Sequence, residues 1–142
     1  MKKTILYISL IVFFTSCANN KNTSSDQKAG NDRDAHNCIS SAGYMWSELK
    51  NDCVRSWEAG IQFDPSSNRS DKTSIASVLF LNGKAEVFAS ELKKPVVLTA
   101  VKNGNILFEN TTEKVAILKE DGRLNLRIGG VVSYVREGVE ME

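Results

Sequence analysis

Residues 114–136, KVAILKEDGRLNLRIGGVVSYVR, decide the fold. The stretch contains three apolar runs separated by Asp121-Gly122 and Gly129-Gly130. Such dipeptides suit two-residue hairpin turns, whose central residues adopt positive φ. Apolar and polar residues alternate through Arg123–Ile128 with the period of a half-buried strand. The stretch therefore predicts three consecutive antiparallel strands.

The turns also predict which residues pair, because turn length sets the register of a hairpin. The apolar pairs expected are Ile117 with Leu126, Val115 with Ile128, Ile128 with Val131 and Leu124 with Val135. The polar face of the last hairpin would then consist of Arg123, Asn125, Arg127, Tyr134 and Arg136. Arg123 would lie opposite Arg136, and because opposed like charges are destabilising, this face is a candidate surface for an anionic partner. An ordinary solvated face is the alternative, since Glu120 and Glu137 are close enough to neutralise the arginines.

Short strands alternate with turns throughout the chain after Ser74. Asn82-Gly83 and Asn103-Gly104 supply two further turns. The other strands are expected at 75–81, 84–89, 96–102 and 105–110, with a first strand starting at Ile61. We therefore expect a mainly β (α+β) domain, an antiparallel meander of seven to eight strands forming a small curled sheet or open barrel.

Residues 47–59 have a helical pattern. Leu49, Cys53 and Trp57 recur every four residues, Ser47 is placed to cap the helix, and Gly60 follows its end. We therefore expect one N-terminal helix, tied to the domain by a disulfide.

The first seventeen residues have the pattern of a secretory signal. Two lysines precede an apolar run, 5–14, that is too short to span a bilayer. Thr15-Ser16-Cys17 resembles a bacterial lipobox, in which the cysteine is lipidated and becomes the mature N-terminus. We expect 1–16 to be a signal peptide, 17–37 a lipidated Cys17 with a disordered polar tether, and 38–142 the folded domain. The lipid would anchor the protein to the outer membrane, on either its periplasmic or its surface side.

Assigning Cys17 to lipid leaves Cys38 and Cys53 as an even pair. In an oxidising envelope, a disulfide closing this loop of about 15 residues would stabilise the domain by ~3 kcal/mol. A metal site is the alternative, but two cysteines and the single histidine, His36, lack C-x-x-C spacing. We therefore expect a structural disulfide, with no metal and no cofactor.

Composition and motifs argue against nucleic acid binding and catalysis. The 142 residues include 18 basic and 17 acidic ones, and removing the two lysines of the signal leaves 16 against 17, a net charge of −1. This charge gives no electrostatic basis for binding nucleic acid. G-x-S-x-G, H-E-x-x-H and a phosphate-binding glycine loop are absent, and His36 lies in the expected tether. Glu48, Asp52 and Glu58 fit a solvated helix face better than a catalytic pair, so we expect no enzyme activity.

Aromatic residues surround the expected disulfide, and among them Tyr44 and Trp46 form a second candidate binding surface, with core packing as the alternative. The sequence around them, 38–58, can be written C-x4-G-Y-x-W-S-x2-K-x2-C-[IV]-x2-[FW]-E. This pattern resembles one in small lipoproteins of Gram-negative bacteria that have no assigned activity. The resemblance implies an exported, disulfide-tied domain.

Two strand–turn–strand phrases, at 81–88 and 119–126, resemble those of the small β-barrel in membrane-bound lysozyme-inhibitor lipoproteins. This resemblance implies a barrel fold and, as one specific function, inhibition of lysozyme. We expect a non-catalytic, lipid-anchored envelope lipoprotein whose β domain binds an envelope or extracellular component, either a protein or a glycan. A structural subunit of an envelope complex is the alternative, and a carboxylate-based hydrolase is a third reading.

Overall fold

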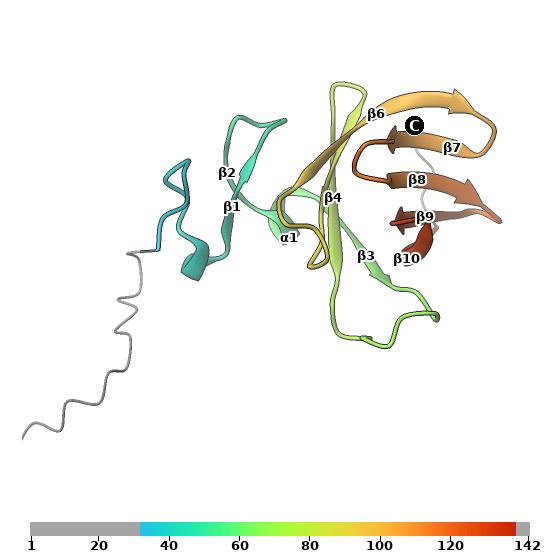
Figure 1. Ribbon diagram of the computed structural model, residues 1–142, viewed down its shortest axis with the longest axis horizontal. Coiled ribbons are helices and arrows are strands. Elements are labelled where there is room, and N and C mark those ends of the chain that lie inside the picture. Colours follow the sequence, from blue (N-terminus) through green and yellow to red (C-terminus); the bar gives the residue numbers. More distant parts are fainter. Residues whose placement is uncertain (1–31, 139–142) are drawn as a thin grey trace, which may run out of the picture.

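Figure 1 shows the computed structural model, which describes residues 32–138. Eight strands form a closed antiparallel barrel, in which each strand pairs with the next along the chain and the last pairs with the first. These strands are β3 (Ile61–Pro65), β4 (Ala76–Leu81), β5 (Lys84–Phe88), β6 (Val96–Asn103), β7 (Ile106–Asn110), β8 (Val115–Glu120), β9 (Arg123–Ile128) and β10 (Val131–Glu137). The predicted mainly β fold is confirmed, and the barrel is closed, whereas the sequence predicts a curled sheet or an open barrel.

Apolar side chains fill the interior of the barrel. The large, fully buried ones include Phe63, Leu98, Ile117, Leu126 and Tyr134, which come from strands around the whole circumference. An eight-stranded barrel is just wide enough for its interior to be filled by side chains. A binding site is therefore to be sought on the outer surface or at the barrel ends.

The turn at Asp121-Gly122 sets the register as predicted. Ile117 pairs with Leu126 and Val115 with Ile128. The two turn residues have φ values of +51° and +74°. Left-handed backbone at both positions matches the right-handed twist of the flanking strands, which explains why this dipeptide marks a tight hairpin.

The predicted register of the last hairpin is wrong beyond Val132. A β-bulge between Val132 and Tyr134 inserts one residue, so Tyr134 pairs with Leu126 and not with Asn125. Every later pair is shifted by one residue. The shift turns Tyr134 into the barrel interior, where its exposed fraction is 0%.

The predicted helix over 47–59 is also wrong, because a hairpin forms there. The Ser47 hydroxyl does accept a hydrogen bond from the Lys50 N–H, at 3.1 Å, as a helix cap would. Asn51, however, has a φ of +52° and turns the chain back, so the cap closes a turn and no helix continues from it. The elements formed are β1 (Tyr44–Ser47), β2 (Asp52–Arg55) and a short α1 (Ser56–Ala59).

The predicted disulfide between Cys38 and Cys53 is confirmed. It joins β2 to the segment that precedes β1, which includes the 3-10 helix η1 (Ser40–Ala42). The folded unit therefore contains a small disulfide-tied module ahead of the barrel.

This module begins before the predicted domain boundary at Cys38. The Asp34 carboxylate accepts the N–H groups of His36 and Cys38, both at 2.9 Å. Residues 32–37 thus belong to the folded unit and not to the tether. The predicted signal peptide, Cys17 and the rest of the tether lie outside the described residues. Among the residues that are described, no helix has the length and hydropathy to cross a bilayer.

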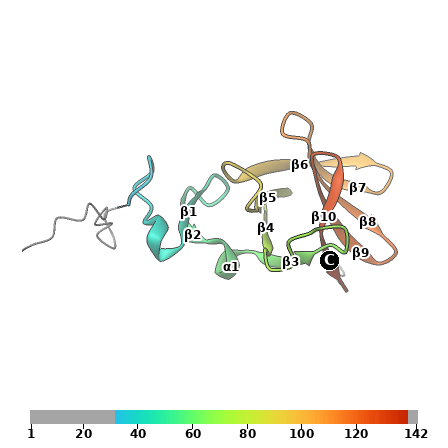
Figure 2. The ribbon, with the colours of Figure 1, turned by 60° about the horizontal axis from the view of Figure 1, so that its bottom comes forward.

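The hairpin of β1 and β2 lies on the side of the barrel formed by β4 and β5 (Figure 2). Apolar contacts dock it on the outer face of these strands. Leu79 and Phe88 point away from the barrel interior and form a buried cluster with Val54 of β2. Gly60, just after α1, lies so close to β4 that an added Cβ would be 2.8 Å from the backbone of Val78. A side chain at this position would push the module away from the barrel.

A buried carboxylate lies in the same interface. Glu86 of β5 has an exposed fraction of 0%, with Ala85 and Val87 on either side pointing into the barrel. Its Oε2 accepts the Ser47 hydroxyl at 2.5 Å and its Oε1 accepts the Glu48 N–H at 2.8 Å. Burial of a charge requires such hydrogen bonds, so Glu86 links the hairpin to the barrel.

Replacing Glu86 is expected to destabilise the fold strongly. Glu86→Ala should lower the free energy of unfolding by about 2–4 kcal/mol, because it leaves the buried Ser47 hydroxyl and Glu48 N–H without their acceptor. Glu113→Ala, at an exposed position, is the control and should change it by less than about 0.5 kcal/mol. Urea unfolding of the full chain measures both, and equal midpoints for the two variants would contradict the linking role.

Candidate functional site

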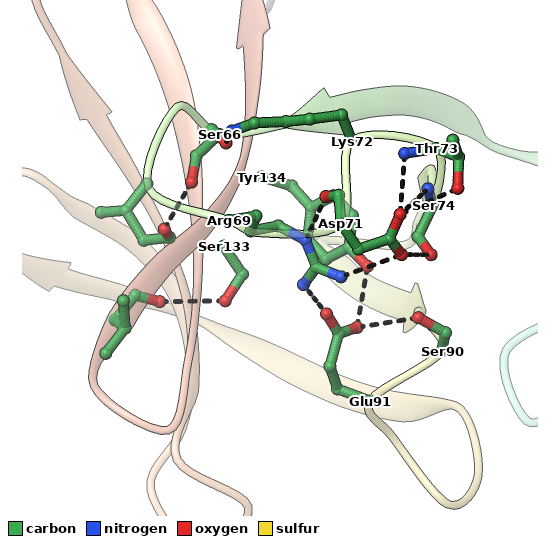
Figure 3. A network of polar contacts seen from close by, with 12 residues as sticks. Ser66, Arg69, Asp71, Lys72, Thr73, Ser74, Ser90, Glu91, Ser133 and Tyr134 are labelled. Carbon is green, nitrogen blue, oxygen red and sulfur yellow. Dashed lines mark hydrogen bonds and ion pairs between the residues drawn. The ribbon is translucent and has the colours of Figure 1, made fainter.

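A polar network closes one end of the barrel, where the loop between β3 and β4 meets the loop between β5 and β6 (Figure 3). The Arg69 guanidinium forms an ion pair with the Glu91 carboxylate and lies 4.5 Å from the centre of the Tyr134 ring. The Tyr134 hydroxyl donates to Glu91 Oε2 at 2.8 Å. We call Arg69, Asp71, Glu91 and Tyr134 the polar clasp.

Asp71 completes the clasp from the loop between β3 and β4. Hydrogen bonds from the Ser74 hydroxyl and then from the N–H and hydroxyl of Thr73 hold the pKa of the Asp71 carboxyl well below its usual range. The charged carboxylate also lies 3.7 Å from Arg69. The donors and acceptors of the clasp bind one another. The clasp therefore has a structural role, which is to hold the two loops together.

The second polar region is a groove between the disulfide-tied module and the loop between β5 and β6. Its volume is about 230 Å³. We call it the hairpin groove. It is lined by Asp34, His36, Ser40, Tyr44, Met45, Trp46, Glu48, Lys93, Lys94 and Pro95.

Aromatic rings form one wall of the hairpin groove. The imidazole of His36 stacks on the indole of Trp46, with 4.2 Å between ring centres and 6° between planes. Arg55 lies over the neighbouring Tyr44 ring at 4.7 Å. Met45, with 38% of its surface exposed, also lines the groove, but it lies on the opposite face of β1 from Tyr44 and Trp46. The wall therefore offers flat and apolar surface that remains accessible to solvent.

Two lysines from the loop between β5 and β6 form the opposite wall. Within residues 32–138, no carboxylate forms an ion pair with Lys93 or Lys94. Lys94 also lines two neighbouring hollows, of about 420 and 520 Å³, which reach Lys84 and Lys114 respectively. The groove therefore opens into a longer surface that is lined by lysines and by carboxylates, among them Glu48 and Glu113.

The residues of one predicted binding surface line the hairpin groove, whereas those of the other do not form the expected surface. Tyr44 and Trp46 both line the hairpin groove, whereas Tyr134 is buried in the barrel. Arg123 lies opposite Glu137, with 3.8 Å between the charged groups, and not opposite Arg136.

The other members of the predicted polar face also have local partners or lie apart from the groove. Arg136 donates to the Gln62 carbonyl at 2.9 Å, and Asn125 donates to Glu120 at 3.0 Å. Arg127 lines a separate shallow hollow. The unusual pairing of like charges that made this face a candidate is therefore absent.

Among the groove residues that sequence reasoning missed are His36, Lys93 and Lys94. His36 was assigned to the tether, although its position two residues before Cys38 brings it close to the disulfide. Lys93 and Lys94 lie in a loop without periodicity, and only their tandem placement before Pro95 distinguishes them.

Metal chemistry finds no support in the described part of the chain, where no three His, Cys, Asp or Glu side chains are grouped to hold an ion. The groove offers binding surface instead: stacked rings, two ammonium groups, and the Glu48 carboxylate as an acceptor.

No protein-family model, no curated protein and no solved structure matches this chain. Its function is therefore inferred from the groove and from the signals in the sequence.

Proposed function

We propose that this protein is a non-catalytic, lipid-anchored envelope lipoprotein whose barrel domain binds an envelope or extracellular component in the hairpin groove. The hairpin groove is the observation on which this proposal rests. Its residues combine accessible aromatic surface with charged groups of both signs, while the polar clasp is satisfied within itself. The filled barrel interior leaves the outer surface as the place for a ligand.

The sequence supports the location. A charged start, a short apolar run and small residues before Cys17 fit export followed by lipidation. The Cys38–Cys53 disulfide fits an oxidising compartment. A lipid at Cys17 and the polar stretch after it would hold the groove near the membrane while leaving it free to reach a partner.

The anchor is tested by metabolic labelling with an alkyne fatty acid. The wild-type full chain is expected to incorporate the probe and to fractionate with membranes. Cys17→Ser should lose both properties, because lipid attachment needs the thiol. Cys53→Ser is not a suitable control, since it breaks the disulfide, so Ser16→Ala serves instead. Equal labelling of wild type and Cys17→Ser would contradict the anchor.

The binding role is tested by photo-crosslinking in cells. Benzoylphenylalanine in place of Met45 should give one discrete adduct on irradiation, because this exposed side chain lines the groove. The same group in place of Val131, which is 59% exposed and outside the groove, is the control and should give none. Absence of any adduct at position 45 would contradict binding in the groove. A stoichiometric protein adduct would favour the alternative of an assembly subunit.

A further inference from the structure

We propose that the hairpin groove binds an extended peptide segment of a partner protein, which adds a strand to the open edge of β1 and carries both acidic and basic side chains. This inference rests on the proposed function and names the ligand class for the same groove. It follows from the position of the groove along β1, from the hydrogen-bonding groups at that strand edge, and from the charges on the two walls.

The groove runs along the open edge of β1. Within residues 32–138, β1 pairs with β2 alone, whereas every strand of the barrel has a neighbour on both sides. Tyr44, Met45 and Trp46 all line the groove, although successive side chains of a strand point to opposite faces. A hollow that is reached from both faces of a strand lies at the edge of that strand. The loop between β5 and β6, at residues 93–95, bounds the groove on its other side.

The main chain of Trp46 faces this edge. The Tyr44 N–H donates to the Ile39 carbonyl at 3.1 Å and not to β2. Main-chain groups alternate in direction along an antiparallel strand, so Trp46, two residues further on, also directs its N–H and C=O away from β2. Within residues 32–138, no hydrogen bond from outside the hairpin occupies these two groups. They can therefore pair with an added strand.

The outer edge of β2 differs from that of β1. Cys53 pairs with Trp46, so its N–H points outward from β2, and it donates to the Asp52 carboxylate at 2.7 Å. A side chain that occupies an outward N–H hinders the pairing of another strand. The edge of β1, by contrast, has an open N–H at Trp46 and borders the groove.

The charges on the two walls favour a ligand with both signs. Within 32–138, neither Lys93 nor Lys94 forms an ion pair, and the Glu48 carboxylate forms none either. Ammonium groups on one wall and a carboxylate on the other complement acidic and basic side chains of the same ligand. A polypeptide supplies both, together with main-chain groups that match the strand edge.

A single extended segment fits the groove better than a second copy of this chain does. A second copy that paired through its own β1 would bring its β2 along as the next strand of the same sheet. That strand would have to occupy the place of the loop between β5 and β6, which bounds the groove. One added strand needs no such space.

The test begins with selection from a phage library of random octapeptides on the full chain in detergent micelles. We expect enrichment of peptides that carry both charges and are rich in β-branched and aromatic residues, without proline at their centre. The selected peptide is then synthesised and titrated by calorimetry, with each main-chain nitrogen methylated in turn. Methylation should weaken binding at least about tenfold at alternate positions and less than about threefold between them, because every second N–H of an added strand points to β1.

Two variants of Trp46 separate the contribution of the main chain from that of the indole. Trp46→Val removes the indole and keeps the N–H, whereas Trp46→Pro removes both. We expect Trp46→Pro to bind the selected peptide at least about tenfold more weakly than Trp46→Val. Proline is tolerated on edge strands, so circular dichroism should show an intact barrel in both variants. The methylation series uses the wild-type chain and decides the question if the proline variant does not fold.

The charge contacts are tested by a double-mutant cycle. Amidation of the acidic side chains of the peptide should weaken binding to wild type at least about threefold and leave binding to Lys93→Ala/Lys94→Ala unchanged. Lys102→Ala, an exposed change on β6 outside the groove, is the control and should respond as wild type does.

Several results would overturn the inference. These are no enriched peptide, enriched peptides of a single charge, equal affinities of Trp46→Val and Trp46→Pro, or a methylation series without alternation. A wild-type dimer in light scattering that Trp46→Pro dissociates would assign the edge to a second copy. Enriched peptides that match the sequence of this chain outside 32–138 would assign the edge to the chain itself.

The crosslinking experiment separates failure of this inference from failure of the proposed function. An adduct at position 45 without any enriched peptide would keep the binding role and reject the peptide. Absence of both would reject both.

Discussion

The hydrogen bonds of one buried carboxylate hold the two walls of the hairpin groove in place. Glu86 is fully buried, and among the described residues its carboxylate oxygens accept the Ser47 hydroxyl and the Glu48 N–H in an interface that excludes water. Ser47 directly follows Trp46, which belongs to the aromatic wall. Glu86 itself lies on the strand that leads into the loop carrying Lys93 and Lys94. The same contact therefore sets the distance between rings and lysines.

The parts of the fold that depend on local chemistry were predictable from the sequence, and those that depend on tertiary packing were not. Asp121-Gly122 predicted its own hairpin because positive φ is a property of the turn residues themselves. No local sequence pattern predicts the bulge before Tyr134. The bulge arises where the barrel closes and a large ring can fill the barrel interior. Residues 47–59 show the same limit: Ser47 caps a turn as its chemistry allows, but packing against β4 and β5 selects a hairpin over a helix.

The candidate site was likewise predictable only where it depends on local sequence. Tyr44 and Trp46 could be named from the sequence because they belong to a recognisable disulfide motif. Lys93 and Lys94 could not be joined to them, since 46 residues lie between Trp46 and Lys93 and only the docking of the hairpin on the barrel brings them together. The polar clasp could not be predicted from the sequence either, because Arg69, Glu91 and Tyr134 come from three separate parts of the chain. In functional terms, the clasp fastens the barrel end and leaves the groove as the accessible polar surface.

The central claim, that Glu86 docks the hairpin and thereby forms the groove, is tested most directly by amide hydrogen exchange in the full chain. Glu86→Gln is compared with wild type, since the amide keeps the size of the side chain but has one acceptor oxygen where the carboxylate has two. The account predicts faster exchange at Glu48, Lys50 and the rest of the turn between β1 and β2, with unchanged protection in β8 and β9. Unchanged exchange in the hairpin, or equal acceleration throughout the barrel, would contradict it.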